Sequence, residues 1–569
     1  MTLVITNKHS RKLVESAHIG TNRAMLAAVV RRAGYDPTRY FRERRPIIGL
    51  LHTHSELSPC QAGLYDLALG SQRVLTEHGI VGVLAAHSSY NDALPMGLPG
   101  MSYSLPSRDV TADGFELSTR LGLDGAVLFV SCDKTLPAAA IAAGRRQDLP
   151  LVIVHGGPIA PGRWRGAPID IGDASEAAGK VAKGLLSPDE ALEICDHACS
   201  GLGGCGMMAT SSTMASVLAA LGLLVAASAS TPASHPDKLD EARIAATHLL
   251  NLMSHDMTIG DIVTRRSLEN AVRMVAAVGG STNAILHLPA IANAFGIVLG
   301  LGEMSDLLHS TPVLLNIRPL GKHRMTDLHE AGGIPAVMKY MIREGLLHGD
   351  CLNVSGVTLK ETVASAVDLE FGEGEQDVVR SVSQPFMRQS HIRLLSGNLG
   401  TCVGKFNAPG AFSGPAICFD NEEAAAEAVY VGKVRAGHVL VVRYEGPAGG
   451  PGMREMLNIT SALVGMGLKD SVAFVSDGRT SGVAHARAVC VHAEPEAYHG
   501  GNIALIDDGD RITIDHEAGT FDLHVAPAVL AERRETWVRP SLRTVDSTIL
   551  RRYRSLVEPP SRGCVLRDE

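Results

Sequence analysis

Short β-rich runs alternate with helix-like segments in the first part of the chain, and this alternation restricts the possible folds more than any other feature. The β-rich runs are PIIGLL at 46–51, GAVLFV at 125–130 and LPLVIV at 149–154. Helix-like stretches lie between them at 62–78 and 108–121. Strands that alternate with helices usually pair in parallel, so we expect an α/β/α domain built on a parallel sheet.

Chemically distinctive residues follow two of these predicted strands. The segment HTHSELSPC, which ends at Cys60, follows the first strand, and SCDK follows the second. A thiol, a carboxylate and an amine therefore stand side by side at Cys132, Asp133 and Lys134. Parallel sheets bind ligands beyond the carboxyl ends of their strands, so we expect a functional site here.

The pattern of the chain changes after about residue 380. Residues 175–300 are helical in pattern and rich in alanine and leucine. Beyond 380, strand-like runs are separated by glycine-rich turns, at 416–419, 438–444, 472–477, 503–506, 511–515 and 521–525. Such runs are typical of a barrel or sandwich, and the chain is too long for one core. We therefore predict an N-terminal α/β domain over 1–385 and a C-terminal β-barrel-like domain over 386–569.

Charge and hydropathy exclude several kinds of partner. The net charge is −8 and basic tracts are short, such as RERR at 42–45, so neither nucleic acid nor an anionic membrane surface is an expected partner. The first residues lack the apolar core of a signal peptide. The longest apolar stretch, 214–229, is short for a membrane span and contains serines, so we expect a buried helix there. We predict a cytoplasmic protein with reduced cysteines.

Three cysteines stand beside glycine, proline or a strand end. They are Cys60 in SPCQ, Cys132 in SCDK and Cys205 in GGCGMM. Their long spacings match neither a zinc ribbon nor a ferredoxin, which use short Cys-x-x-Cys steps. Because free cysteine is among the most buried residue types, isolated core thiols remain an alternative to a metal site.

A second group of cysteines lies in CDHACSGLGGC. A structural zinc ion could be bound there by Cys195, His197, Cys199 and Cys205, although the spacing is irregular. Alternatively, Cys195 and Cys199 share one helix face at i and i+4 and belong to the core.

Carboxylates occur in two glycine-rich loops. Asp92 lies in SYNDALPMGLPGM, and Glu455 lies in RYEGPAGGPGMREM after a predicted strand. Together with Asp133 they offer the hard oxygen ligands that Mg²⁺ prefers. The second loop could instead cradle a phosphate, but it lacks the Lys-Ser/Thr ending of a nucleotide-binding loop.

Ser481 lies in SDGRTSGV, in a tight turn after a predicted strand. Serine is a common turn former, and it can also act as an activated base or nucleophile. The residue type alone does not separate these two interpretations.

Taken together, these stretches resemble the dihydroxy-acid dehydratase / 6-phosphogluconate dehydratase family, which includes sugar-acid dehydratases. The motifs that carry the resemblance are TNRAML, SPCQ, PMGLPGMSYSLPSRD, SCDKTLPAA, VHGGPIAPG, ACSGLGGCGMMATSSTMA, ENAVRMVAAVGGSTNAILHL, VSGVTL, GNLG, RYEGPAGGPGMREML, SDGRTSG and SLRTVDSTILRRYRSLV. They run nearly end to end, and the order of SCDK, GGSTNA and GGPGMREM makes the resemblance specific.

The resemblance implies a role for each residue singled out above. The implied ligands of an iron–sulfur cluster are Cys60, Cys132 and Cys205. The implied ligands of Mg²⁺ are Asp92, Asp133, Lys134 and Glu455, with Lys134 converted to a carbamate. Ser481 would be the catalytic base. We expect [2Fe–2S] rather than [4Fe–4S], and a homodimer or a dimer of dimers with the family's α/β and β-barrel-like domains.

The implied enzyme is a hydro-lyase that converts a 2,3-dihydroxy acid to a 2-oxo acid. YSLPSRD favours branched-chain members, and CDKTLPAA favours sugar-acid members. We expect a short acid such as 2,3-dihydroxy-3-methylbutanoate, as in branched-chain amino acid biosynthesis. The alternative is an aldonate that gives a 2-keto-3-deoxy acid. His52 and His54, where the family often has Asn and Trp, and Cys402 leave the substrate open.

Two non-catalytic interpretations also remain. An iron–sulfur electron carrier or sensor would need a fourth ligand, for which the candidates are Cys195, Cys199 and Cys402. A scaffold with a structural zinc would need none of the magnesium ligands.

Overall fold

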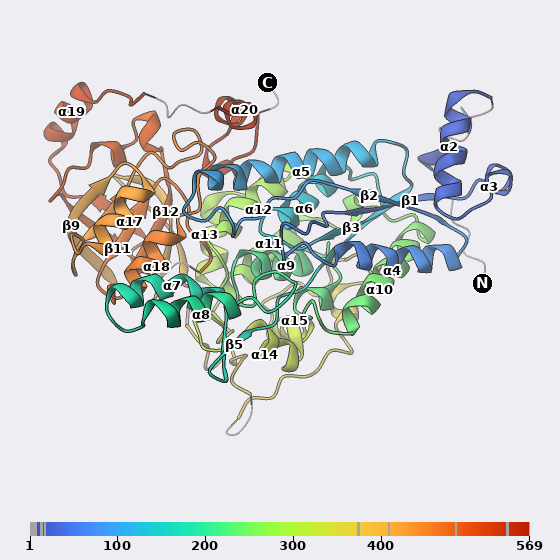
Figure 1. The fold of residues 1–569 in the computed structure, drawn as a ribbon, viewed down its shortest axis with the longest axis horizontal. Coiled ribbons are helices and arrows are strands. Elements are labelled where there is room, and N and C mark those ends of the chain that lie inside the picture. The colour runs from blue at the N-terminus through green and yellow to red at the C-terminus, as the bar shows by residue number, and fades with distance from the viewer. Residues whose placement is uncertain are drawn as a thin grey trace.

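The computed structural model describes residues 8–11, 15, 19–372, 376–407, 410–483, 486–541 and 546–567. Its N-terminal part contains a four-stranded parallel sheet in the order β2-β1-β3-β4. The strands are β1 (Ile47–His52), β2 (Val81–Ala86), β3 (Gly125–Val130) and β4 (Leu151–His155). Figure 1 shows α5 (Ser104–Thr119) on one side of this sheet, and α4 (Leu64–Glu77) and α10 (Asp237–Ser254) on the other. The predicted α/β fold is confirmed.

Burial explains which strands the sequence reveals. Every residue of β1, β3 and β4 is buried, as expected of parallel strands covered on both faces. The edge strand β2 has the sequence VGVLAA and becomes exposed toward its end. The sequence analysis does not predict this strand, because glycine and alanine have low β-propensity.

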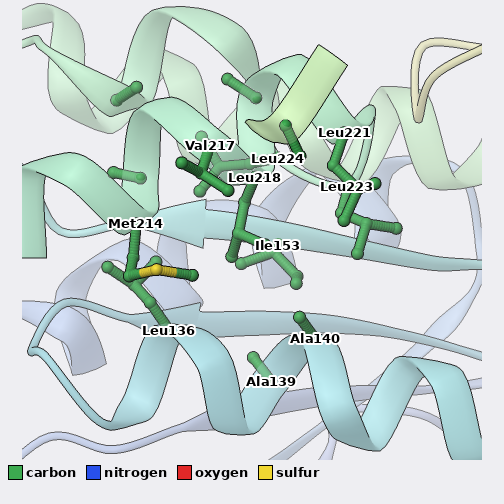
Figure 2. Packing of buried hydrophobic residues seen from close by; sticks show 14 of the residues in the cluster. Leu136, Ala139, Ala140, Ile153, Met214, Val217, Leu218, Leu221, Leu223 and Leu224 are labelled. Atoms are coloured by element: carbon green, nitrogen blue, oxygen red, sulfur yellow. The ribbon is translucent and has the colours of Figure 1, made fainter. Parts of the chain in front are cut away.

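The long apolar stretch 214–229 is buried, as predicted, but it is not one helix. Helix α9 (Thr210–Leu221) ends at Gly222, whose φ of 93° is left-handed and suits glycine. A short 3₁₀ turn, η2 (Ala226–Ala229), follows. Figure 2 shows Met214 and Leu218 of α9 packed toward α6 (Thr135–Arg145) and β4. No helix in the described part of the chain combines the length and apolarity needed to cross a membrane.

The C-terminal part contains a closed barrel of eight strands in the order β10-β11-β12-β8-β7-β14-β13-β9. The strands are β7 (Ile392–Gly397), β8 (Gly400–Phe406), β9 (Ala411–Phe419), β10 (Val439–Val442), β11 (Ala473–Ser476), β12 (Ala488–Glu494), β13 (Arg511–Asp515) and β14 (Thr520–Leu523). An apolar cluster that includes Val441, Val475 and Phe521 belongs to this barrel. The predicted β-barrel-like architecture is confirmed.

One predicted strand is wrong. The run IALI at 503–506 forms a 3₁₀ turn, η5 (Asn502–Leu505), instead of a strand. The turn closes because Ala504 N donates to Gly501 O at 2.9 Å. Ile503 is nevertheless fully buried. A short apolar run therefore indicates that a segment is buried, but not whether its backbone pairs with a neighbouring strand.

Close backbone contact joins the two parts of the chain. Helix α7 (Ile171–Ala182) crosses α18 (Leu457–Gly465) at Gly179 and Gly465. A Cβ atom on Gly465 would lie 2.5 Å from the Cα of Gly179, so only glycine permits this approach. The contact packs a helix of the N-terminal part directly against the helix that lies between β10 and β11 in the chain.

Candidate active site

Loops from the sheet and the barrel meet between the two parts of the chain. Cys60 follows β1, Asp92 follows β2, and the SCDK turn follows β3. From the barrel, Glu455 follows β10 and Ser481 follows β11. These loops extend from the carboxyl ends of parallel strands, where ligand sites are expected.

The turn that carries Cys132 is tied to the loop that carries Cys60. Thr135 Oγ1 accepts a hydrogen bond from Cys132 N at 3.0 Å at the start of α6. The same hydroxyl accepts from Gln61 Nε2 at 3.3 Å, and Gln61 Oε1 accepts from Thr53 Oγ1 at 2.7 Å. One buried polar network therefore holds both cysteine loops.

The loop of Cys205 contacts both of these loops through its glycines. Gly203 N donates to the carbonyl of Pro59, next to Cys60, at 2.9 Å. A Cβ atom on Gly204 would lie 3.1 Å from the carbonyl oxygen of Ser131, next to Cys132. Such a contact is tighter than ordinary van der Waals distance, so glycine favours the close approach of the loops.

The thiols influence one another electrostatically. Hydrogen bonding to Cys60, followed by burial, raises the pKa of Cys132. Burial raises the pKa of Cys205, and the negative charges of Asp133 and Cys60 add to this effect. The loops of the three cysteines that the sequence singled out thus meet, and Cys60 influences the other two thiols electrostatically. A cation bound among them would favour their thiolate forms.

Three carboxylates surround the amine of Lys134, which is 1% exposed. Lys134 Nζ lies 3.5 Å from Asp92 Oδ2, 4.0 Å from Asp133 Oδ2 and 3.8 Å from Glu455 Oε2. In the described part of the chain, neither Lys134 Nζ nor Asp92 Oδ1 has a hydrogen-bond partner. Burial raises the pKa of Asp133 to about 7, against the opposing effect of Lys134.

The thiols and the carboxylates lie next to one another. Cys132 Sγ lies 3.9 Å from Asp92 Oδ2, within hydrogen-bonding reach for sulfur. One ligand atom from each of Asp92, Cys132 and Asp133 lies within 4.8 Å of the others. Among the described residues, no other three ligand atoms of His, Cys, Asp or Glu lie so close together.

Arg479 is a functional candidate that the sequence analysis missed. Its side chain is fully buried, and it forms an ion pair with Glu455. It also donates to the carbonyl of Met453 at 2.8 Å and to Ser104 Oγ at 2.8 Å. Its position in SDGRTSG, between a strand end and Ser481, was a usable signal.

Replacing Arg479 with methionine is expected to lower the free energy of unfolding by about 3–5 kcal/mol, because it removes the cation paired most closely with the buried carboxylate of Glu455 and leaves that carboxylate facing Lys134 Nζ at 3.8 Å. Arg479→Lys keeps the charge and should lose clearly less. Urea unfolding midpoints of the three proteins compare the effects. A loss below about 1 kcal/mol for Arg479→Met would mean that Glu455 is compensated by another group.

His287 and Arg108 were also missed. Arg108 donates to His287 Nδ1 at 3.3 Å and to the carbonyls of Gly563 and Cys564 at 2.8 and 2.9 Å. Burial lowers the pKa of His287, and the charges of Arg108, Lys134 and Arg479 add to this effect. A neutral imidazole therefore lies near the lysine and its carboxylates, and the C-terminal segment is anchored beside it.

Ser481 is buried in the loop after β11, two residues beyond Arg479. Its Oγ accepts a hydrogen bond from Val483 N at 3.4 Å. The preceding carbonyl, of Thr480, accepts from Asn283 Nδ2 at 3.2 Å, which links the loop to α12 (Asn283–Ala294).

The glycine-rich loop after β10 is not a phosphate cradle. Its amide groups at Ala448 and Gly449 donate to the carboxylate of Glu496 at 3.2 and 3.1 Å. Farther back, Tyr444 N and Glu445 N donate to Asp477 at 3.1 and 3.0 Å. Carboxylates already occupy the donors that a phosphate would need, so this alternative is wrong.

The remaining cysteines lie in different surroundings. Cys195 is exposed on α8 (Pro188–His197), and Cys402 packs in the barrel cluster, beside Cys490. Cys199 is exposed as a residue. Partial burial of its thiol is the main cause of its raised pKa, and the charge of Cys60 adds to this effect. Cys199 is therefore the candidate for a fourth ligand that shows an electrostatic influence from Cys60.

Comparison with known proteins gives matches over nearly the whole chain. The family described as Dihydroxy-acid/6-phosphogluconate dehydratase N-terminal matches residues 45–362, and its C-terminal counterpart matches 377–564. Proteins named dihydroxy-acid dehydratase from Chloroflexus aurantiacus and Nitrosospira multiformis are 41% and 40% identical over 98% of this chain, and over 98% and 99% of their own lengths. A protein of the same name from a Synechococcus strain is 40% identical over 98% of this chain and 97% of its own.

Proposed function

Because the chain belongs to the dihydroxy-acid/6-phosphogluconate dehydratase family, we propose that it is a hydro-lyase that converts a 2,3-dihydroxy acid to a 2-oxo acid. The observation that carries this proposal is the contact between two groups of potential ligands. Three cysteine loops and three buried carboxylates meet where Cys132 Sγ lies 3.9 Å from Asp92. One small molecule placed there could contact both groups.

The donor set fits a divalent cation at the carboxylates. Among the described residues, Asp92, Asp133 and Glu455 face two cations, Lys134 and Arg479, so the fully ionised group carries an excess negative charge. Buried charge of this kind is compensated by a bound cation or by protonation. The raised pKa of Asp133 and the Asp92 oxygen that lacks a partner among the described residues are both expected of a site that binds Mg²⁺.

We assign Mg²⁺ to Asp92, Asp133, Lys134 and Glu455. Carbamylation of Lys134 would turn an amine that lacks a hydrogen-bond partner among the described residues into an oxygen ligand. We assign an iron–sulfur cluster to Cys60, Cys132 and Cys205, because three clustered thiols leave one iron without a fourth protein ligand. We further propose [2Fe–2S] and a cytoplasmic homodimer, for which the motif resemblance is the support. Iron and sulfide analysis and sedimentation test these last two points.

The bound metals would polarise the substrate carboxylate and C2 hydroxyl and act as a Lewis acid toward the C3 hydroxyl. The chain itself must then remove the C2 proton. We assign this step to Ser481, which lies two residues from Arg479 at the same junction. A serine hydroxyl is too weakly acidic to supply a base unless positive charge near it stabilises the alkoxide.

Ser481→Ala is expected to lower turnover by roughly 10²–10⁴-fold and to stop exchange of the substrate C2 proton with solvent deuterium. The fold should survive, because Oγ makes only the weak 3.4 Å contact with Val483 N among the described residues. Proton NMR of the substrate in D₂O follows the exchange.

The adjacent hydroxyl provides a matched control for this variant. Thr480 Oγ1 is buried and has no hydrogen-bond partner in the described part of the chain. Thr480→Val should therefore keep both exchange and turnover within about 3-fold of the parent protein. Continued exchange in Ser481→Ala would assign the proton transfer to another group.

We propose a short branched acid of the 2,3-dihydroxy-3-methylbutanoate type as the substrate, which would place the enzyme in branched-chain amino acid biosynthesis. The relatives named dihydroxy-acid dehydratase support this choice. A phosphorylated acid is disfavoured because Glu496 occupies the amides of the glycine-rich loop.

A substrate panel tests the proposed function. The anaerobically purified protein is assayed for 2-oxo acid formation from branched 2,3-dihydroxy acids and from aldonates. We expect kcat/KM to be highest for the branched acid. Higher kcat/KM for an aldonate would make the enzyme a sugar-acid dehydratase, and no 2-oxo acid from any member would contradict the proposal.

A further inference from the structure

The peptide groups on both sides of Ser481 are held by buried side chains from other elements. Asn283, at the start of α12, donates to the carbonyl of Thr480 at 3.2 Å. Lys405, on β8, donates through Nζ to the carbonyl of Gly482 at 2.8 Å. The serine therefore lies between two anchored carbonyl groups, one fixed from the N-terminal part and one from the barrel.

The loop also packs tightly against the first turn of α9. A Cβ atom on Gly482 would lie 3.0 Å from both Ala209 Cα and Thr210 N. Asn283 Nδ2 donates to Thr210 Oγ1 at 3.0 Å, which connects this turn to the serine loop. Free amide groups at a helix N-terminus add positive potential on this side of the loop.

Lys405 is an unusual residue to find here. Its side chain is 2% exposed, and no carboxylate in the described ranges lies within ion-pair distance of its Nζ. Burial lowers the pKa of Lys405 to about 7. A buried lysine without a counter-charge is unfavourable for folding, whereas methionine could fill similar space without that cost.

We propose that Lys405 is a positioning residue for Ser481. It fixes the serine loop through the Gly482 carbonyl and, in its protonated form, provides positive charge to that loop. The inference rests on the proposed function, in which Ser481 removes the C2 proton. Lys405 contacts the loop backbone and not the reacting atoms, so it acts through the serine. Its charge favours the alkoxide form that a serine base requires.

Lys405→Met in the full-length holoenzyme tests this role. We expect kcat to fall by roughly 10²-fold and C2-proton exchange to fall with it, while KM stays within about 3-fold. The visible absorbance and metal content should not change, and the unfolding temperature should stay the same or rise. Lys405→Arg, which keeps the charge and a donor, should recover most of the lost kcat.

Two results would overturn the inference. Unchanged kcat in Lys405→Met would show that the lysine is not needed. A joint fall of kcat, absorbance and unfolding temperature in both Lys405 variants would show a structural role. The double variant Lys405→Met/Ser481→Ala separates a positioning role from a structural one. If Lys405 acts through the serine, Lys405→Met should not lower the residual turnover of Ser481→Ala any further, because the serine hydroxyl is already absent.

Failure of the inference and failure of the proposed function are distinguishable. If Ser481→Ala abolishes exchange and Lys405→Met does not reduce it, only the inference fails. If Ser481→Ala retains exchange, the assignment of the base fails whatever Lys405→Met does.

Discussion

Cys132→Ser is expected to abolish the visible absorbance of the anaerobically purified protein and to lower its turnover by at least ~10³-fold. Mutating a residue that only hydrogen-bonds to a metal ligand already lowers activity about 10–100-fold, so loss of a ligand itself should cost more. Cys132 is buried, its thiol pairs with Cys60, and it lies 3.9 Å from Asp92. Losing it would therefore remove a cluster ligand at the point where the two ligand groups meet. A serine hydroxyl is a poor substitute because iron–sulfur clusters are held by thiolates.

Cys195→Ser is the matched control for this prediction. Cys195 is exposed on α8 and belongs to the alternative zinc set, so its replacement should leave absorbance and activity unchanged. Absorbance spectra, iron analysis and turnover are measured on both variants. Unchanged absorbance in Cys132→Ser would remove Cys132 from the cluster ligands, and zinc without iron in the parent protein would favour the scaffold interpretation.

Glu455→Gln is expected to lower turnover by about 10³-fold while leaving the iron content and visible absorbance intact. Glu455 Oε2 lies 3.8 Å from Lys134 Nζ, and the carboxylate pairs with buried Arg479. Glutamine keeps the size of the side chain but removes the charge that would hold Mg²⁺. The loss should therefore appear in the dependence of rate on magnesium concentration, with no change in the cluster spectrum.

Glu423→Gln serves as the control for charge loss near the same loop. Glu423 pairs with Arg454, but its side chain is 54% exposed, and it lies outside the carboxylates around Lys134. The turnover of the Glu423→Gln variant should stay within about 3-fold of that of the parent protein, because an exposed ion pair contributes little. Full activity of Glu455→Gln at ordinary magnesium concentrations would contradict the assignment of Glu455 as a ligand.

Strands with a continuous apolar run or a clear alternation of apolar and polar residues were the ones that the sequence could predict. The run GAVLFV coincides with β3, and RITID coincides with β13. The edge strand β2 was missed, and a strand was wrongly predicted where the 3₁₀ turn η5 lies. The two errors have opposite causes. The edge strand has weak β-formers and is partly exposed, whereas IALI is buried without strand partners, and local sequence reports burial better than pairing.

The candidate site shows a similar division. Residues at strand ends, such as Cys132 and Asp133, could be placed in a ligand site from topology alone. Cysteine spacing could not show that the loop of Cys205 lies against the loop of Cys60. That contact depends on the hydrogen bond from Gly203 N to Pro59 O, which links loops distant in the sequence. Arg479 escaped notice because an arginine in a turn is usually solvated, and only the tertiary structure shows its burial against Glu455.

We propose that a cluster iron without a fourth protein ligand lies beside a magnesium site, so that one substrate contacts both. Mössbauer spectroscopy of ⁵⁷Fe-loaded, anaerobically purified protein, with and without the branched dihydroxy acid, tests this directly. We predict that the signal of one iron site changes when the acid is added and that the others stay the same. Identical spectra with and without substrate in a turning-over enzyme, or an active enzyme without iron, would contradict the account.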